Sequence, residues 1–259
     1  GMFQPVAISR AFEKKHMAVI YTSGSTGKPK AIINDYQQKL WFISNGKHRP
    51  QQCSEPVTIL ATMPLYHQGG IFTVEQAMFF TSTPKTHLVL MPQFDAKQCI
   101  QLIQQYRVNF LRLVSPMMSM LLQEQDLLDQ ADFSHVHTII LSSSHAPLTL
   151  IDQLPKYFPQ VKHIENPYNM TETGALFEFY NSKGQHRPLG SVGCPIRGVD
   201  CRINDHGVLE VKGPSVITSY HNRPDLNNSF TQDGYLITGD MFTVDENGFY
   251  FYQGRADSM

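Results

Sequence analysis

Residues 21–30 read Tyr21-Thr22-Ser23-Gly24-Ser25-Thr26-Gly27-Lys28-Pro29-Lys30 and continue a β-like apolar segment that begins at residue 16. Glycines allow a backbone to approach a ligand closely and to adopt positive φ without steric cost. Free N–H groups in such a loop bind anions, hydroxyl groups add donors, and lysines add positive charge. We therefore interpret this stretch, called the signature loop below, as a loop that binds phosphate.

The signature loop differs from a Walker A loop. The Walker A pattern is G-x-x-x-x-G-K followed by Ser or Thr, whereas Thr22 stands at its first glycine and Pro29 follows the lysine. Pro29 also lacks the backbone N–H that a phosphate-binding helix start would offer. The alternative is a polar turn that is merely rich in Gly and Ser. The length of the loop and its place after an apolar strand favour phosphate binding.

Length and composition limit the class of protein. The chain has 259 residues and a formal net charge of −1 at pH 7. This length allows either one large domain or a large domain with a smaller one. We expect no nucleic-acid partner and no membrane, because like charges do not cluster and no apolar run could span a bilayer. The cysteines, Cys53, Cys99, Cys194 and Cys201, lack C-x-x-C spacing. They indicate reduced thiols in a cytoplasmic protein, with a Cys194–Cys201 disulfide as the alternative.

The distribution of apolar residues predicts an α/β fold. Strand-like and helix-like segments alternate between residues 16 and 180, which is typical of a mainly parallel sheet with helices on both faces. The expected strands are residues 58–63, 88–91, 108–114, 138–141 and 161–164. The expected helices are residues 71–80, 96–106 with Asp95 as N-cap, 116–122 and 148–158, and a helix that starts after an Asn34 cap.

The pattern changes near residue 190. Short β-like runs follow, with hairpin-turn signals at Asp205-His206-Gly207 and Glu246-Asn247-Gly248. We expect residues 2–189 to form the α/β subdomain and residues 190–254 a small β-rich subdomain or partial barrel. Ligands of parallel sheets bind at the carboxyl ends of the strands. The signature loop, His67, residues 142–146 and residues 166–172 all follow expected strands, so we expect them to meet at one edge.

Several motifs resemble, in the same order, those of the adenylate-forming (AMP-binding) superfamily. Within it the chain is similar to acyl- and aryl-CoA synthetases of the 4-coumarate–CoA ligase or O-succinylbenzoate–CoA ligase type. The motifs are the signature loop, Ser142–Leu148, Tyr168-Asn169-Met170-Thr171-Glu172, Gly207–Tyr220, Thr238-Gly239-Asp240 and Gly254-Arg255-Ala256-Asp257. The chain departs from the family pattern where it has Ala31, Ser144, His145, Asn169, Val208 and Ser219.

The resemblance implies a role for each motif except Gly207–Tyr220, which we interpret as scaffold. The phosphates of ATP would be held by Thr22, Ser23, Gly24, Ser25, Thr26, Gly27, Lys28 and Lys30. The adenine would lie among Ser144, His145, Ala146, Asn166, Tyr168, Asn169 and Met170. Thr171 would contact a phosphate, and Glu172 would bind Mg²⁺, which prefers oxygen ligands. Asp240 would accept both ribose hydroxyls, Arg255 would reach ribose or phosphate, and residues 255–259 would form a hinge segment.

Each of these side chains also has a purely structural interpretation. A threonine of this kind often caps a helix, a glutamate is often solvated, and an acid in a turn such as Asp240 is often only an Asx cap. Pro64-Leu65-Tyr66-His67 resembles the segment that places an aromatic–histidine pair beside the carboxylate substrate. A histidine satisfied by the fold is an equally good interpretation of His67. The order of the complete set along the chain favours the functional interpretation.

The resemblance implies an enzyme that uses ATP and Mg²⁺ to activate a small carboxylic acid as an acyl-adenylate, releases pyrophosphate and transfers the acyl group to coenzyme A. The chain stops at Met259, so we expect the family's C-terminal domain, with its catalytic lysine, and most of the usual N-terminal portion to be absent. The alternatives are a nucleotide-binding protein without catalysis and a fragment of a longer synthetase. The acid and the oligomeric state stay open at this point.

Overall fold

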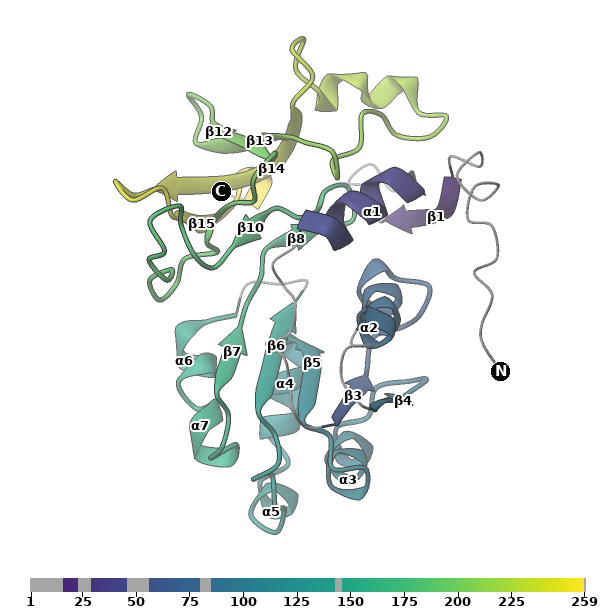
Figure 1. The fold of residues 1–259 in the computed structure, drawn as a ribbon, viewed down its shortest axis with the longest axis vertical. Helices are drawn as coiled ribbons and strands as arrows, with labels where there is room; N and C mark the ends of the chain where they lie inside the picture. The colour runs from purple at the N-terminus through teal and green to yellow at the C-terminus, as the bar shows by residue number, and fades with distance from the viewer. Residues whose placement is uncertain (1–15, 23–28, 46–55, 80–84, 143–145, 259) are drawn as a thin grey trace. The chain divides into compact units, whose positions relative to one another are not determined.

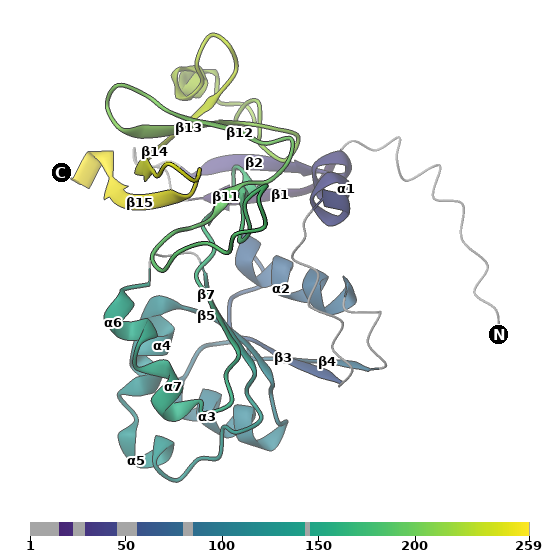
Figure 2. The same ribbon diagram turned by 60° about the vertical axis from the view of Figure 1, so that its left-hand side comes forward.

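The computed structural model describes residues 16–22, 29–45, 56–79, 85–142 and 146–258. They form two compact units, and most of their elements are labelled in Figure 1 and in Figure 2, which shows a second direction. The first unit takes its described residues from Gly1–Gly46, Met170–Gln185 and Gly193–Met259, and the second takes them from Lys47–Asn169 and His186–Val192. The predicted subdomain limits at residues 189 and 254 and the hinge at 255–259 stay predictions.

The second unit is built on a parallel sheet. Its strands are β3 (Val57–Ala61), β4 (Thr86–Leu90), β5 (Phe110–Val114), β6 (Thr138–Ser142) and β7 (His163–Glu165). They lie in the order β4-β3-β5-β6-β7, and every neighbouring pair is parallel. The prediction of an α/β fold with a mainly parallel sheet is confirmed for this part of the chain.

Helices cover both faces of this sheet. They are α2 (Gln68–Phe79), α3 (Ala96–Gln105), α4 (Ser115–Leu122), α5 (Gln125–Leu128), α6 (Leu148–Ile151) and α7 (Leu154–Tyr157). Successive side chains of a strand point to opposite faces, and this alternation builds two cores. Phe110 packs in a small cluster with Ala77 of α2, whereas its neighbour Leu111 belongs to a larger core with Ile100 of α3 and Leu121 of α4. Full burial of such a side chain stabilises the fold by about 1.5–3 kcal/mol.

Two helix predictions have different outcomes. The expected cap of α3 is confirmed, because the side chain of Asp95 accepts a hydrogen bond from the N–H of Gln98 over 2.8 Å. The single helix expected over residues 148–158 is wrong, because the structure has two short helices, α6 and α7, in its place. Pro155 is the physical reason. Proline fits only the first turn of a helix, so a new helix starts around it.

The first described segment of the first unit is a hairpin and not a parallel pair of strands. Strands β1 (His16–Thr22) and β2 (Lys30–Asp35) pair antiparallel, so the parallel alternation expected from residue 16 is wrong for this segment. Helix α1 (Tyr36–Asn45) follows directly. The expected Asn34 cap is also wrong, because α1 begins at Tyr36 and the residue directly before it is Asp35. Asp35 caps α1 instead: its Oδ1 accepts from the N–H of Gln38 over 2.7 Å, and its N–H donates to Gln38 Oε1 over 3.2 Å.

An antiparallel sheet forms the other part of the first unit. Strands β12 (Asp200–Ile203), β13 (Val208–Lys212), β14 (Leu236–Val244) and β15 (Tyr250–Arg255) lie in that order. Gly207 at φ 76° and Gly248 at φ 81° occupy the turns between them, a conformation that glycine adopts without strain. Shorter elements are β8 (Asn169–Met170), β9 (Gly174–Ala175), β10 (Phe177–Glu178), β11 (Cys194–Pro195), η3 (Pro224–Ser229) and η4 (Ala256–Ser258). The β-rich prediction is confirmed.

Cys99, Cys194 and Cys201 form no disulfide, so the alternative of a Cys194–Cys201 disulfide is wrong. Cys53 lies outside the described residues. Burial raises the pKa of both the Cys99 and the Cys201 thiol to about 12, which keeps them protonated and unreactive at neutral pH. In the described ranges, every helix is too short or too polar to cross a membrane.

Candidate functional site

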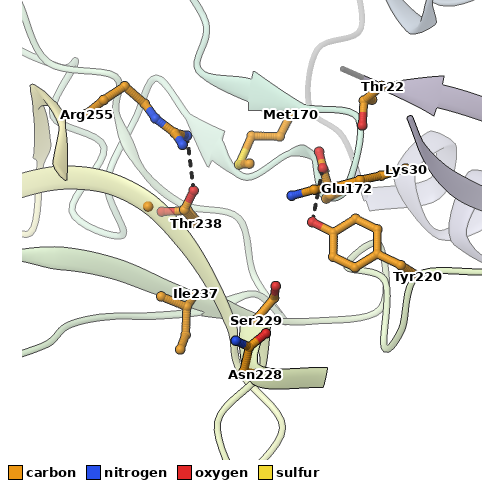
Figure 3. Close-up of a pocket in the computed structure, with 11 residues that line it drawn as sticks. Thr22, Lys30, Met170, Glu172, Tyr220, Asn228, Ser229, Ile237, Thr238 and Arg255 are labelled. Atoms are coloured by element: carbon orange, nitrogen blue, oxygen red, sulfur yellow. Dashed lines mark hydrogen bonds between the residues drawn. The ribbon is translucent and has the colours of Figure 1, made fainter. Parts of the chain in front are cut away.

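A pocket of about 560 Å³ lies within the first unit (Figure 3). Its walls come from the β1–β2 hairpin, from β8 and the segment after it, from η3 and the segment before it, and from strands β14 and β15. The lining residues are Thr22, Lys30, Met170, Glu172, Tyr220, Asn228, Ser229, Ile237, Thr238, Gly239 and Arg255. Its volume is within the range of about 300–1,000 Å³ that small-molecule sites occupy.

The hairpin contributes the two ends of the signature loop. Thr22 ends β1 and Lys30 begins β2, and the two residues are partners across the hairpin. The buried hydroxyl of Thr22 has no hydrogen-bond partner among the described residues. A buried polar group without a partner costs about 1–3 kcal/mol, so a ligand that accepts this hydrogen bond would recover stability. The pocket therefore presents a hydroxyl and an ammonium group from one hairpin.

Glu172 places a carboxylate in the same pocket. It is 8% exposed, and its Oε1 accepts a hydrogen bond from the hydroxyl of Tyr220 over 3.2 Å. Its backbone oxygen accepts from the N–H of Ile217 over 2.9 Å. Burial, together with the negative charge of Glu172, raises the pKa of Tyr220 well above its ordinary value, so this hydroxyl stays a donor at neutral pH.

Arg255 supplies a second cation, and Asp240 lies beside it. The two residues are partners on β15 and β14, and Nη1 of Arg255 lies 3.3 Å from Oδ1 of Asp240. The hydrogen bond to Asp257, supported by the charge of Asp240, raises the pKa of Arg255. Asp240 is 6% exposed and is not one of the residues that line the pocket. In this structure it contacts the pocket through Arg255.

The Thr238-Gly239-Asp240 motif lies within strand β14 and not in a turn after a strand, as the sequence suggested. Gly239 has φ 75°, and the pairing of β13 with β14 shifts register in this region, as at a β-bulge. The hydroxyl of Thr238 accepts from the N–H of Asp240 over 3.1 Å. The local backbone thus aims Thr238 and Gly239 at the pocket while Asp240 is buried behind them.

Other predicted site residues belong to the second unit. The amide of Asn166 donates to the backbone oxygen of Leu141 over 2.6 Å and accepts from the N–H of Ala146 over 3.0 Å. It therefore ties the end of β6 to the segment expected to hold adenine. Tyr168 is half-buried. His67 is exposed, and its Nδ1 accepts from the N–H of Gly69 over 3.1 Å, a contact that fits the structural interpretation of this histidine.

The structure thus groups part of the predicted site. It brings to one pocket Thr22, Lys30, Met170, Glu172 and Arg255, with Asp240 in contact with Arg255. Thr171 is half-buried and does not line this pocket. The second unit holds His67, Ala146, Asn166, Tyr168 and Asn169. Outside the described residues lie Ser23, Gly24, Ser25, Thr26, Gly27, Lys28, Ser144 and His145. The roles of all these residues stay predictions.

The structure also adds residues that the sequence did not single out for the site. Tyr220 ends a motif that we interpreted as scaffold, yet it lines the pocket and contacts Glu172. Thr238 belongs to the same motif as Asp240, so the motif itself was a signal for it. Asn228 and Ser229 come from η3, and no sequence pattern pointed to them.

Comparison with known proteins agrees with these motifs. The model of the AMP-binding enzyme family matches residues 5–221. A 2-succinylbenzoate–CoA ligase of Bacillus cereus is 29% identical over 270 residues, which cover 100% of this chain and 54% of that protein. The corresponding ligase of Bacillus subtilis is 28% identical, over 93% of this chain and 49% of that protein.

Solved structures share the fold. The O-succinylbenzoate coenzyme A synthetase (MenE) from Bacillus subtilis, in complex with AMP, matches with a TM-score of 0.69 and 26% identity over 92% of this chain and 49% of that one. A luciferase-like enzyme from the mealworm Zophobas morio matches with a TM-score of 0.76 and 22% identity over 94% of this chain and 58% of that one. The chain spans about half the length of the curated relatives it matches. Because the family model covers most of its residues, this chain belongs to the AMP-binding enzyme family.

Proposed function

We propose that this chain is the nucleotide-binding part of an ATP-dependent acid–thiol ligase. In the proposed reaction an acid is activated as an acyl-adenylate, and the acyl group passes to coenzyme A. The observation that carries the proposal is the pocket of the first unit, in which Lys30, Glu172 and Arg255 come together from separate segments of the chain. Two cations and a buried carboxylate are the groups that a nucleotide phosphate with Mg²⁺ requires.

The proposed chemistry has two displacements. A carboxylate oxygen of the acid attacks the α-phosphorus of ATP, the bond from that phosphorus to the bridging oxygen of the β-phosphate breaks, and pyrophosphate leaves. The thiolate of coenzyme A then attacks the acyl carbon, a thioester forms, and AMP leaves with the bond electrons. Such displacements depend on positioning and charge neutralisation more than on covalent help from the protein.

The residues of the pocket fit these tasks. Lys30 would hold phosphate oxygens together with the predicted contacts Ser23 and Thr26, and the hydroxyl of Thr22, which has no partner among the described residues, would donate to the ligand. Glu172 would hold Mg²⁺, which when bound neutralises negative charge on the phosphates. Loss of one well-placed electrostatic contact of this kind lowers a reaction rate by about 10²–10³-fold.

The nucleoside would be held by the remaining predicted residues. Tyr168 offers a ring face on which adenine can stack, and Asn166 holds the backbone of Ala146 in the neighbouring segment. Asp240 would accept the ribose hydroxyls after Arg255 turns toward phosphate. His67 would lie beside the carboxylate of the acid substrate, and Thr171 would contact a phosphate oxygen.

The relatives suggest which ligands to test. Structures of MenE from Bacillus subtilis are described as complexes with AMP and with ATP and magnesium ion. The curated relatives are named 2-succinylbenzoate–CoA ligases. We therefore propose ATP, Mg²⁺ and coenzyme A as ligands of the complete enzyme, and 2-succinylbenzoate as the first acid to test.

The test separates binding from catalysis. Isothermal titration calorimetry with AMP, and with ATP in the presence and absence of Mg²⁺, is expected to show binding that Lys30→Gln and Glu172→Gln weaken. Pyrophosphate release is then measured with 2-succinylbenzoate and a panel of other aryl and acyl acids. Binding without turnover would support the nucleotide site but not catalysis, and would favour a non-catalytic nucleotide-binding chain. If neither AMP nor ATP binds, the proposal is wrong.

A further inference from the structure

Tyr220 contacts two oppositely charged side chains of the pocket, Glu172 and Lys30. Its hydroxyl donates to Oε1 of Glu172 over 3.2 Å, and Nζ of Lys30 lies 5.1 Å from the centroid of its ring. Figure 3 shows the three side chains together at one wall of the pocket. In the described part of the chain, Lys30 and Glu172 form no ion pair with each other. One aromatic side chain thus contacts both groups through different atoms.

The two contacts differ in their chemistry. The hydroxyl donates to Oε1 of Glu172 and limits the rotation of the carboxylate, because hydrogen bonds are directional. The ring face attracts the ammonium group through its quadrupole and leaves the N–H donors of Lys30 available to a ligand. A direct ion pair between Lys30 and Glu172 would occupy both groups at once. Tyr220 therefore keeps each charge in the pocket without neutralising it against the other.

The backbone around Tyr220 fixes this geometry. The N–H of Ile217 donates to the backbone oxygen of Glu172 over 2.9 Å, and the N–H of His221 donates to the backbone oxygen of Ala31 over 2.9 Å. Residues 217–221 thus join the chain next to Lys30 to the residue that carries the carboxylate. Tyr220 is itself 8% exposed, and its ring packs 6.1 Å from the ring of Phe230. Because backbone hydrogen bonds hold its segment at both ends, Tyr220 has few other orientations available.

We infer that Tyr220 is a positioning residue, whose hydroxyl orients Glu172 for Mg²⁺ and whose ring orients Lys30 for phosphate. This inference rests on the proposed function, because it assigns the two halves of one side chain to the two ligands proposed for that pocket. It also explains why an aromatic residue with a hydroxyl lies at this position. Phenylalanine would supply only the contact to Lys30, and an aliphatic residue would supply neither.

Three variants of the chain test the two roles separately. Tyr220→Phe removes the hydroxyl and keeps the ring, and Tyr220→Leu removes both. Phe230→Leu is the matched control, because it disturbs the packing of Tyr220 from outside the pocket. For each variant, calorimetry measures the affinity for ATP with and without Mg²⁺, and thermal unfolding checks that the chain is folded. The decisive quantity is the gain in ATP affinity that Mg²⁺ produces.

In Tyr220→Phe we expect the gain from Mg²⁺ to fall by about threefold to tenfold, the effect of one lost hydrogen bond, while metal-free ATP binding stays as in the unsubstituted chain. In Tyr220→Leu we expect metal-free binding to fall as well, by about twofold to tenfold, because Lys30 loses the ring. Phe230→Leu is expected to lower the unfolding temperature and to leave both binding quantities unchanged.

Other results overturn the inference. If Mg²⁺ increases the ATP affinity of Tyr220→Phe as much as that of the unsubstituted chain, the hydroxyl has no positioning role. If Tyr220→Phe and Tyr220→Leu bind metal-free ATP with equal affinity, the ring has no positioning role. If Phe230→Leu reproduces the pattern of Tyr220→Leu, Tyr220 acts only through packing. Absence of all nucleotide binding in the unsubstituted chain would instead refute the proposed function, and with it this inference.

Discussion

The guanidinium group of Arg255 lies 3.3 Å from the carboxylate of Asp240, and the two residues face each other across strands β15 and β14. The carboxylate is buried and the guanidinium lines the pocket. Arg255 also donates to the backbone oxygen of Thr238 over 3.3 Å. The cation is therefore held at the pocket wall by groups of its neighbouring strand before any ligand binds.

Replacing Asp240 tests whether this carboxylate serves the nucleotide. We expect Asp240→Ala to weaken AMP binding by about tenfold or more, because a hydrogen bond to a charged group contributes about 1.5–3 kcal/mol. Asp240→Asn keeps the shape of the side chain and should weaken binding less. Calorimetry measures the affinity and circular dichroism the fold. An AMP affinity equal to that of the unsubstituted chain would exclude Asp240 from the site.

Gly239 offers a test of the backbone at the pocket wall. A Cβ added there would lie 3.2 Å from Nη2 of Arg255, on a residue with φ 75°. We expect Gly239→Ala to destabilise the chain by about 1–3 kcal/mol and to weaken AMP binding by displacing Arg255. Gly248→Ala is the matched control, because Gly248 has φ 81° and open space around its Cβ position. Equal AMP affinities in the two variants would contradict a role for Arg255 in the site.

The charge of Lys30 should matter more for ATP than for AMP, because ATP carries the additional phosphates. We expect Lys30→Gln to weaken ATP binding by about tenfold at low salt and by less at high salt, since salt screens the interaction. Lys212→Gln is the control, because Lys212 is exposed and donates to the backbone oxygen of Asp233 away from the pocket. A similar loss in both variants would indicate a non-specific effect of net charge.

The buried thiols predict a loss of stability at alkaline pH. Burial raises the pKa of Cys99 and Cys201 from 9.0 to about 12. Above pH 9 the folded chain therefore keeps protons that the unfolded chain releases. The contribution of the two protonated thiols to the free energy of unfolding is complete below pH 9 and is lost as the pH rises toward 12. Urea unfolding at a series of pH values is expected to show the decline.

The same thiols allow a chemical measurement. We expect the Cys99 peptide to resist iodoacetamide at pH 8.5 in the folded chain, because Cys99 is fully buried and only the thiolate reacts. Mass spectrometry of the urea-unfolded chain, in which the same peptide should be labelled, is the control. Rapid labelling of Cys99 in the folded chain would show that helix α3 opens far more readily than its packing suggests.

Features encoded by neighbouring residues were predicted well from the sequence. The cap of α3 by Asp95, the glycine turns at Gly207 and Gly248, and the strands of the parallel sheet follow from local patterns. Errors arose where the local sequence is compatible with two different structures. Asn34 and Asp35 are both good caps, and only the point at which β2 ends selects Asp35. The hairpin of β1 and β2 was missed because strand direction depends on pairing and not on periodicity.

The sequence by itself determined the family, the α/β and β-rich character of the chain, and the chemistry of its motifs, because glycines, hydroxyls and charges act over a few neighbouring residues. Only the tertiary structure decided which of these groups share a pocket. Tyr220 and Glu172 are 48 positions apart in the chain, and Asp240 contacts the pocket through a residue of the next strand. Contacts of this kind depend on how strands and segments pack, and the packing is set by the burial of the whole unit.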